Sequence, residues 1–258
     1  MHTDSTAQHV INPAVRPQAR VALRSARAAI SCSSCCLQGV CLPSGVAASD
    51  LGELDDLTSA KRRVERGGAL YRARDSFSAL YAVRSGTFKS VGISRHGEEK
   101  VTGFHLPGEV MGMEAINSEL HSYDAIALED SEVCVIPYQR LTQLARTIPK
   151  LQSGLFRMLS SDISRDHGLM LLLGSMTAEQ RLCAFLLSLS RRYERLGYAS
   201  HCFNLRMTRE DIGSYLGLTL ETVSRLLSRL QREGVITVHQ REIEIKSLTA
   251  MREMGGHW

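Results

Sequence analysis

The sequence lacks long apolar runs, and residues 5–29 contain no acidic side chain. Its apolar runs, such as LMLLL at 169–173 and LCAFLL at 182–187, are far short of the roughly 20 residues that cross a bilayer. Residues 1–29 hold no acid after Asp4, and arginines break any stretch that resembles the core of a secretory signal. We therefore expect a cytoplasmic protein with no membrane partner. We expect residues 1–29 to be a disordered tail, with an Arg-rich transit peptide as the alternative.

A disulfide framework is not expected either. The seven cysteines are an odd number, and 258 residues is far too long for a scaffold stapled by disulfides. A cytoplasmic chain also keeps its thiols reduced. The cysteines must be explained in another way.

Composition indicates a folded chain of two domains. Hydrophobic residues make up 43% of the 258 residues, which is enough for packed cores. The net charge of +4 permits nucleic-acid binding without arguing for it. The position of the charge is more informative, because arginines gather along defined elements between residues 191 and 232.

The hydrophobic pattern changes period along the chain. From about residue 66 to Pro137, short alternating β-branched runs are split every 8–12 residues by Gly, Asp or Pro, which is typical of a β-sandwich or barrel. From about 139 to 193 the apolar residues recur at helical spacing. The fold class that follows is α+β, with a β-rich domain, a long helix and a C-terminal domain.

The long helix carries a heptad stripe that could pair with a second copy of itself. Ile163 and Met170 lie in this stripe, and Asp166 lies in the seam between them. In a parallel homodimer the two Asp166 carboxylates would face each other, and like charges in a partly dry seam cost free energy. We hypothesise that this weakens the dimer and poises it near dissociation. The alternative is an amphipathic helix that lies on its own domain.

Residues 207–247 predict a helix-turn-helix followed by a β-hairpin wing. Thr208 and Asp211 form a capping box, Gly217 closes the first helix, and Thr219 caps the second, which ends at Gly234. The segments VITV and EIEI, separated by HQR, alternate like a hairpin. This pattern indicates a winged helix-turn-helix that binds double-stranded DNA.

The second helix of this motif divides into two faces. Its buried stripe is Val223, Leu226, Leu227 and Leu230. The opposite face carries Glu221, Ser224, Arg225 and Ser228 near the end that enters the major groove. Arg donates two hydrogen bonds to guanine, and Glu accepts one from cytosine. We expect Arg209 and Arg229 to meet phosphates, with Ser228 able to contact either bases or phosphate. The alternative is a solvated polar face with no reading role.

The β-rich domain, the long helix and the motif TREDIGSYLGLTLETVSRLLSRLQREG together resemble the CRP/FNR superfamily of bacterial transcription regulators. The segment ETVSR resembles the recognition helix of its FNR branch, the regulators of fumarate and nitrate reduction, so Glu221, Ser224 and Arg225 match the three base-reading positions. The resemblance implies a jelly-roll (β-roll) sensor domain, a homodimer, RNA polymerase as a partner, and a palindromic DNA site with TTGAT half-sites.

The spacing C-x2-C-x5-C at Cys32, Cys35 and Cys41 suggests a metal centre, with Cys36 as an extra thiol. An iron–sulfur cluster takes four thiolates, but zinc also takes four cysteines, so spacing alone does not fix the metal. Cys36 is next to Cys35, and adjacent residues seldom both aim at one compact centre. Cys134 on the last strand is the better fourth ligand, although a buried structural thiol is an equal alternative there.

The resemblance implies a choice among these alternatives. Regulators of the FNR branch carry a [4Fe-4S] cluster on C-x2-C-x5-C near the N-terminus and on one cysteine of a V-C-x-I-P strand. Cys32, Cys35, Cys41 and Cys134 match those positions, and Cys36 departs from the pattern. The implied function is an oxygen-responsive regulator whose cluster holds the active dimer and is degraded by oxygen. We also suggest that Val40 shields the cluster.

The resemblance also bears on other ligands. The cyclic-nucleotide branch places an arginine shortly after its GE turn to clamp the phosphate, whereas no arginine occurs here from residue 106 to 139, so we expect no cyclic nucleotide. Two rival functions remain: a regulator of this fold with structural zinc or no cluster, and a dithiol redox enzyme at Cys32 and Cys35. The enzyme is disfavoured because such motifs normally open a helix in a βαβ unit.

The domain boundaries that follow are these: a tail at 1–29, a cysteine-rich segment at 30–49, a sensor domain at 50–147, a dimerisation helix at 148–176 and a DNA-binding domain at 177–258.

Overall fold

The computed structural model describes residues 31–93 and 97–256. The tail predicted at 1–29 lies outside them. The cysteine-rich segment folds into turns and two short 3-10 helices, η1 Cys32–Ser34 and η2 Ala48–Asp50. It is followed by a short helix, α1 Leu51–Leu57, that sequence periodicity had not revealed. No described helix is long and apolar enough to span a membrane.

Two antiparallel four-stranded sheets form the sensor domain. One has the strand order β1-β8-β3-β6 and the other β2-β7-β4-β5. The sheets enclose a core that includes Phe88, Val83 and Val133. The strand bounds are β1 Lys61–Val64, β2 Ala69–Tyr71, β3 Ala79–Ser85, β4 Phe88–Ile93, β5 Glu99–His105, β6 Val110–Met111, β7 Asp124–Ala127 and β8 Ser131–Pro137, with a 3-10 turn η3 at Met113–Ala115. The predicted β-roll is therefore present.

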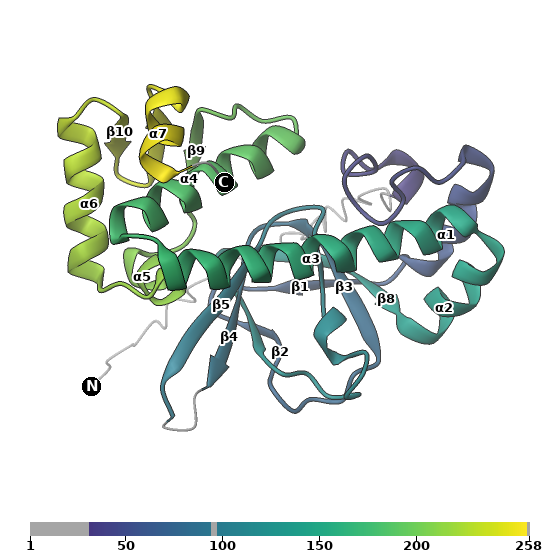
Figure 1. Ribbon diagram of the computed structural model, residues 1–258. Helices are drawn as coiled ribbons and strands as arrows, with labels where there is room; N and C mark the ends of the chain where they lie inside the picture. The colour runs from purple at the N-terminus through teal and green to yellow at the C-terminus, as the bar shows by residue number, and fades with distance from the viewer. Residues whose placement is uncertain (1–30, 94–96, 257–258) are drawn as a thin grey trace, which may run out of the picture.

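The helical run predicted from 139 to 193 is divided into three helices. They are α2 Tyr138–Thr147, α3 Pro149–Ser175 and α4 Ala178–Arg195. Pro149 lacks an amide hydrogen and so begins a new helix instead of continuing the old one. Thr177 begins α4 through a capping box with Gln180. The long α3 crosses the face of the molecule and joins the sensor side to the DNA-binding side (Figure 1).

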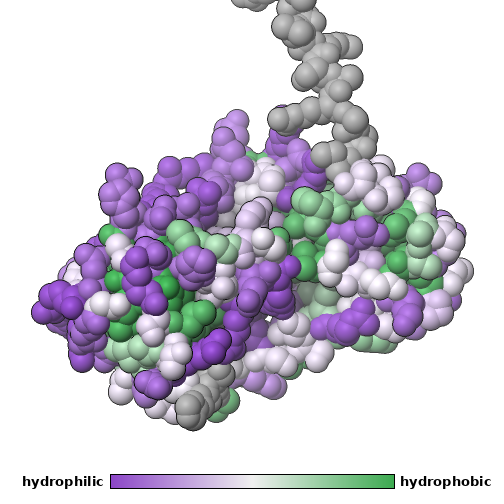
Figure 2. Space-filling view, turned by 90° about the horizontal axis from the view of Figure 1, so that it is seen from above, coloured by the Kyte–Doolittle hydropathy of each residue, from purple (hydrophilic) through white to green (hydrophobic). Residues whose placement is uncertain are grey.

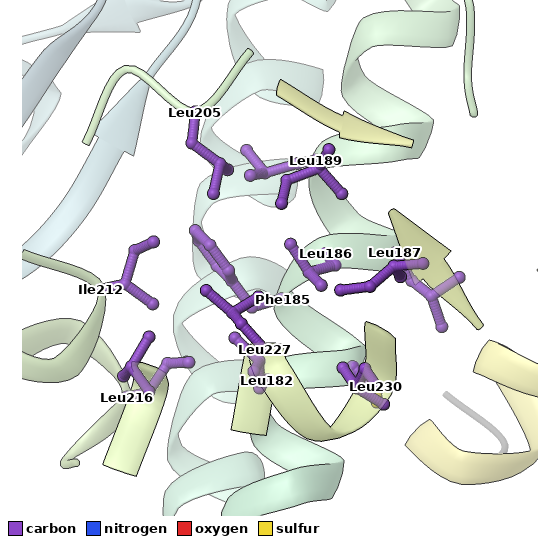
Figure 3. Close-up of a cluster of buried hydrophobic side chains, with 14 of the residues drawn as sticks. Leu182, Phe185, Leu186, Leu187, Leu189, Leu205, Ile212, Leu216, Leu227 and Leu230 are labelled. Atoms are coloured by element: carbon purple, nitrogen blue, oxygen red, sulfur yellow. The ribbon is translucent and has the colours of Figure 1, made fainter. Parts of the chain in front are cut away.

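The C-terminal domain packs three helices and a small sheet around α4. Its elements are β9 Cys202–Asn204, α5 Arg209–Leu216, α6 Leu220–Arg232, β10 Ile236–His239, β11 Glu242–Ile245 and α7 Leu248–Gly255. The predicted hairpin is confirmed as β10 and β11, and β9 adds a third strand to it. Figure 3 shows leucines from α4 and α6 that converge with Ile212 and Leu216 of α5 in one apolar core. Cys183 is fully buried in this core, as its position on an apolar helix face suggests.

The two domains share part of this core. Val101, Phe104 and Leu106 of the sensor belong to the same buried cluster as α4, α5 and α6. The Phe104 ring lies 5.2 Å from the ring of Tyr215 on α5. On the opposite side, the cysteine-rich segment packs with α1, α2 and the beginning of α3 around Leu42, Leu54 and Leu151. Viewed from above, a hydrophilic band separates two hydrophobic areas, one on each of these sides (Figure 2).

Candidate functional site

The helix-turn-helix is built by local capping. The Thr208 hydroxyl accepts from the Asp211 amide at 3.0 Å, and the Asp211 carboxylate accepts from the Thr208 amide at 2.9 Å, so the predicted capping box is confirmed. Gly217 ends α5 at φ 65° in the left-handed region, which favours glycine. Sequence reasoning missed Gly213, where an added Cβ would lie 2.7 Å from the Leu218 carbonyl oxygen. The tight approach of the two helices therefore depends on a second glycine.

The recognition helix α6 has the two faces that its sequence predicts. Val223, Leu226, Leu227 and Leu230 are all buried. In Figure 3, Leu227 and Leu230 point into the core toward α4. On the other face Glu221, Arg225 and Ser228 are exposed and Ser224 is half-buried. The side chains that could meet base edges are thus presented together on one rigid helix.

The predicted phosphate-contacting residues lie beside this face but differ in their partners. Arg209 of α5 donates from Nη1 to the Ser224 hydroxyl at 3.2 Å, so it lies against the recognition face. The Ser228 hydroxyl donates to the Ser224 carbonyl oxygen on its own helix at 2.9 Å. Arg229 is held between two carboxylates, Glu179 at 3.3 Å and Glu233 at 2.8 Å. Arg229 would have to leave these partners to reach a phosphate.

Four thiols from two distant segments line one cavity. Cys32, Cys35 and Cys41 come from the cysteine-rich segment and Cys134 from β8, about 90 residues later, where it pairs with Lys61 of β1. The rest of the lining is mostly apolar, but it also includes Gln38, Thr58 and Arg84. The cavity is small, with a volume of about 30 Å³.

The remaining cysteine of the segment lies outside this site. Cys36 is exposed and does not line the cavity. Val40 does not line it either, because its side chain packs against Gly108, where an added Cβ would lie 2.8 Å from Val40 Cγ2. The suggestion that Val40 shields the thiols is therefore not supported. Val40 instead joins the cysteine-rich segment to the turn at residues 107–109.

Burial controls the acidity of the thiols. It raises the pKa of Cys41 to about 12 and that of Cys134 to about 11, and it also raises the pKa of Cys32. The neighbouring thiols raise each of these pKa values further, because a second thiolate nearby would repel the first. Reactive cysteines need a lowered pKa, so these thiols are poorly suited to nucleophilic or dithiol catalysis. They are suited to binding a group that displaces their protons.

The thiols do not form a site for a single metal ion. Among residues 31–93 and 97–256, no three His, Cys, Asp or Glu side chains converge as they would around one ion. A structural zinc needs four donors within about 2.3 Å of one point. A cluster of four irons takes one thiolate at each iron, so its ligands surround the group instead of converging on one atom. Four cysteines that line one cavity could supply one thiolate to each iron of such a cluster.

The cysteine-rich segment is fixed to the beginning of α3. Leu42, next to Cys41, is buried against Leu151 of α3. Arg157 of α3 donates to the Ser44 carbonyl oxygen at 3.3 Å. A displacement of the thiol-bearing loop would therefore act directly on the first turns of α3.

Further along α3, an apolar stripe faces solvent. Phe156, Ile163 and Met170 are 63%, 55% and 61% exposed, and Asp166 lies exposed between the last two. This much exposed apolar surface along one helix is unusual for a soluble chain unless a partner covers it. The arrangement agrees with the heptad stripe seen in the sequence.

A buried ion-pair cluster joins the sensor to the DNA-binding domain, and sequence reasoning missed it. Glu109 of the sensor accepts two hydrogen bonds from Arg192 of α4, at 2.9 and 2.6 Å, and Arg192 also donates to the Phe104 carbonyl oxygen. Arg165 of α3 lies 3.7 Å from the same carboxylate. Burial acts to raise the pKa of Glu109, but the two arginines lower it to about 2. The only signal in the sequence was the GE turn, which does not reveal its partners.

Two family profiles match the chain. The profile described as a Crp-like helix-turn-helix domain matches residues 180–254, and the profile described as a cyclic nucleotide-binding domain matches residues 61–147. The two matched segments coincide with the DNA-binding half and with most of the β-roll.

Several characterised proteins are similar along most of the chain. The transcriptional regulatory protein btr of Bordetella pertussis is 47% identical over 88% of this chain and 94% of its own length. The anaerobic regulatory protein of Haemophilus influenzae is 44% identical over 91% of each chain. The fumarate and nitrate reduction regulatory protein of Escherichia coli K12 is 41% identical over 93% of this chain and 97% of its own.

Solved structures agree with this result. FixK2 from Bradyrhizobium japonicum matches 77% of this chain and 98% of its own with a TM-score of 0.71 and 30% identity. A transcriptional regulator of the CRP/FNR family from Thermus thermophilus matches 76% of this chain and 98% of its own with a TM-score of 0.59. At 20% identity the second likeness shows the fold alone.

Proposed function

We propose that this chain detects oxygen through a [4Fe-4S] cluster. The chain belongs to the FNR branch of the CRP/FNR family, and it is an oxygen-linked DNA-binding transcription regulator, not an enzyme. The ligands would be Cys32, Cys35, Cys41 and Cys134. The observation that carries this proposal is that these four thiols, and not Cys36, line one cavity from two distant segments. When bound, the cluster supplies an oxygen-reactive iron centre.

The protein's own residues would connect this centre to the dimer. With the cluster bound, the thiolates of Cys32, Cys35 and Cys41 would tie the loop to Cys134 of β8. The loop in turn packs on α3 through Leu42. Loss of the tie would free the loop and remove packing from the first turns of α3. A free-energy bias of only a few kcal/mol changes the populations of two states strongly. Docking of the loop would therefore favour the dimer, and its release would favour the monomer.

The dimer would form along the exposed stripe of α3. Ile163 and Met170 would pack against their copies, and Asp166 would face Asp166 of the second copy. The repulsion of these two carboxylates would keep the dimer close to dissociation, so that a small signal suffices. A dimer presents two recognition helices to successive major-groove faces, whereas a monomer presents one and binds more weakly.

DNA would be read by α6. We assign base contacts to Glu221, Ser224 and Arg225 in a palindrome of TTGAT half-sites, since these three side chains share the outward face of the helix. We assign phosphate contacts to Arg209, Ser228 and Arg229, the last after release from Glu179 and Glu233. RNA polymerase would be the protein partner at promoters, and the site of action the bacterial cytoplasm.

We do not assign a cyclic nucleotide to the sensor, although the matching profile is described by that ligand. Residues 106–139 contain neither arginine nor lysine to hold a phosphate. In addition, the Glu109 carboxylate is already engaged by Arg192 and Arg165. The β-roll would instead support the strand that carries Cys134.

The decisive experiment is the visible absorption spectrum of protein purified without oxygen, recorded before and after exposure to air, together with iron and zinc analysis. The proposal predicts a brown chromophore with about four irons per chain, which air bleaches. Binding to a TTGAT palindrome should fall in parallel, with a scrambled duplex as the control. A colourless protein that contains zinc would support the regulator with a structural metal instead.

A further inference from the structure

Thr58, the residue that follows α1, contacts a proposed cluster ligand. Its hydroxyl oxygen lies 3.0 Å from Cys32 Sγ, and its side chain is buried. The same oxygen lies 2.8 Å from the Leu54 carbonyl oxygen, to which the hydroxyl donates. Thr58 thus stands between the last turn of α1 and the first thiol of the cysteine-rich segment.

The single proton of this hydroxyl can serve either neighbour. While Cys32 is a thiol, its S–H can donate to Thr58, and Thr58 can donate to Leu54. A thiolate bound to iron has no proton, so the contact remains favourable only if Thr58 donates to sulfur. Rotation about the Cβ–Oγ1 bond redirects the proton without moving a heavy atom. The Leu54 carbonyl keeps a partner throughout, because it also accepts from the Thr58 amide at 2.9 Å.

A second contact holds Cys32 in reach of Thr58. The Asp55 carboxylate accepts from the Ser33 amide at 3.0 Å and from the Ser33 hydroxyl at 2.7 Å. Burial acts to raise the pKa of Asp55, but the Ser33 hydrogen bonds lower it, so the carboxylate stays ionised. Asp55 lies on α1, and Thr58 is the C-terminal cap of the same helix. Asp55 therefore fixes the backbone after Cys32, and Thr58 lies next to the Cys32 sulfur.

We propose that Thr58 is a positioning residue for the cluster, whose hydroxyl donates a hydrogen bond to the Cys32 thiolate and slows the reaction of the bound cluster with oxygen. This inference rests on the proposed function. Hydrogen bonds to the sulfurs of an iron–sulfur cluster stabilise its more negative, reduced form and so shift its reduction potential. Without the donor, the cluster loses electrons to oxygen more easily.

The test compares wild type with Thr58→Val, which removes the hydroxyl at similar volume, and Thr58→Ser, which retains it. Each full-length protein is purified without oxygen and its iron content measured, and bleaching is followed at a fixed oxygen concentration. We expect Thr58→Val to bleach about threefold to tenfold faster, as loss of one charge-assisted hydrogen bond implies. Thr58→Ser should bleach like wild type.

A spectroscopic readout separates this role from simple helix stabilisation. Resonance Raman bands of the iron–thiolate bonds should shift on exchange into deuterated water in wild type and Thr58→Ser, and less in Thr58→Val. Equal bleaching rates and equal shifts in all three proteins would overturn the proposal. If Thr58→Val does not fold, as judged by urea unfolding, Thr58→Ala takes its place. A colourless wild type would overturn the proposed function itself, and this inference with it.

Discussion

The DNA reader and the thiol site differ in how far apart their parts lie in the sequence. The reader occupies one continuous stretch, from the Thr208 cap to the end of β11, and the ends of its two helices are fixed by neighbouring caps and glycines. The thiol site joins a segment before α1 to β8 in the opposite part of the sensor domain. A unit made by local contacts is present whenever its segment folds, whereas a site made by distant segments exists only while both are held together.

The two regions also differ in exposure, and this fits their proposed roles. Of the side chains proposed to read bases, Glu221 and Arg225 of α6 face solvent, and Ser224 is half-buried. Cys32, Cys41 and Cys134 are half-buried, and this burial raises the pKa of their thiols, which makes them less reactive. Between the two regions lies the Glu109–Arg192 pair, where α3 and α4 meet the sensor. We predict that loss of the thiol site leaves the helices of the reader folded.

The largest expected effect abolishes the thiol site and leaves the DNA-binding domain folded. Replacing Cys134 by Ala removes one of the four proposed ligands, so the visible chromophore should be lost while the DNA-binding domain remains folded. Visible absorbance, iron content and circular dichroism measure these outcomes. Cys36→Ala is the matched control, because Cys36 lies outside the cavity and its replacement should leave the chromophore intact. A chromophore that survives in Cys134→Ala would show that the fourth ligand is wrong.

The next effect concerns the reader alone. Arg225→Ala should weaken binding to a TTGAT palindrome by about 1–3 kcal/mol and relax specificity at one base pair, with no change in the chromophore. Fluorescence anisotropy with single-base variants of the duplex measures both quantities. Arg229→Ala is the comparison, because the loss of a phosphate contact should weaken binding to all DNA sequences alike. If Arg225→Ala lowers affinity without altering base preference, the assignment of the recognition face is mistaken.

A third effect concerns the pH dependence of stability at the contact between the sensor domain and the DNA-binding domain. Burial lowers the pKa of His105 to about 4, with Glu109, Arg165 and Arg192 nearby. The unfolded chain binds the proton near the ordinary value of 6.5, so the stability that this histidine contributes is full above pH 6.5 and is lost as the pH falls toward 4. We expect a loss of about 3 kcal/mol that His105→Gln abolishes, measured by urea unfolding.

Asp162 of α3 should change stability in the opposite direction over the same pH range. Burial raises its pKa to about 6, so its ionised form destabilises the protein above that pH, and protonation relieves this as the pH falls. Asp162→Asn should therefore make the acid loss of stability steeper than in wild type. Identical pH profiles for wild type and His105→Gln would contradict the buried, neutral state of His105.

The smallest expected effect concerns the dimer seam. Asp166→Ala removes the carboxylate between Ile163 and Met170, so the dissociation constant of the dimer should fall about threefold to tenfold, as removal of one like-charge contact near water implies. Analytical ultracentrifugation without oxygen measures it. Glu119→Ala controls for net charge, because it removes an exposed carboxylate elsewhere on the sensor domain. A weaker dimer in Asp166→Ala would mean that α3 does not pair through this stripe.

Local chemistry made much of the fold predictable. The alternation between residues 66 and 137 predicted the β-roll, and the caps at Thr208 and Thr219 predicted both helices of the reader. Where local signals are weak, prediction failed: α1 has seven residues and α7 eight, too few for periodicity to be clear. The Glu109–Arg192 pair was also missed, because a glutamate and an arginine 83 residues apart carry no mark of contact.

What the sequence determined by itself was the set of elements and the chemistry on each of them: strands from alternation, helix ends from caps and glycines, and a thiol-rich segment from its cysteine spacing. Only the tertiary structure decided which cysteines share a cavity, that Cys36 is excluded from it, that Thr58 reaches Cys32, and that Arg192 closes on Glu109. The reason is physical. Capping and periodicity act over a few residues, whereas burial and ion pairing depend on which distant surfaces the packed core brings together.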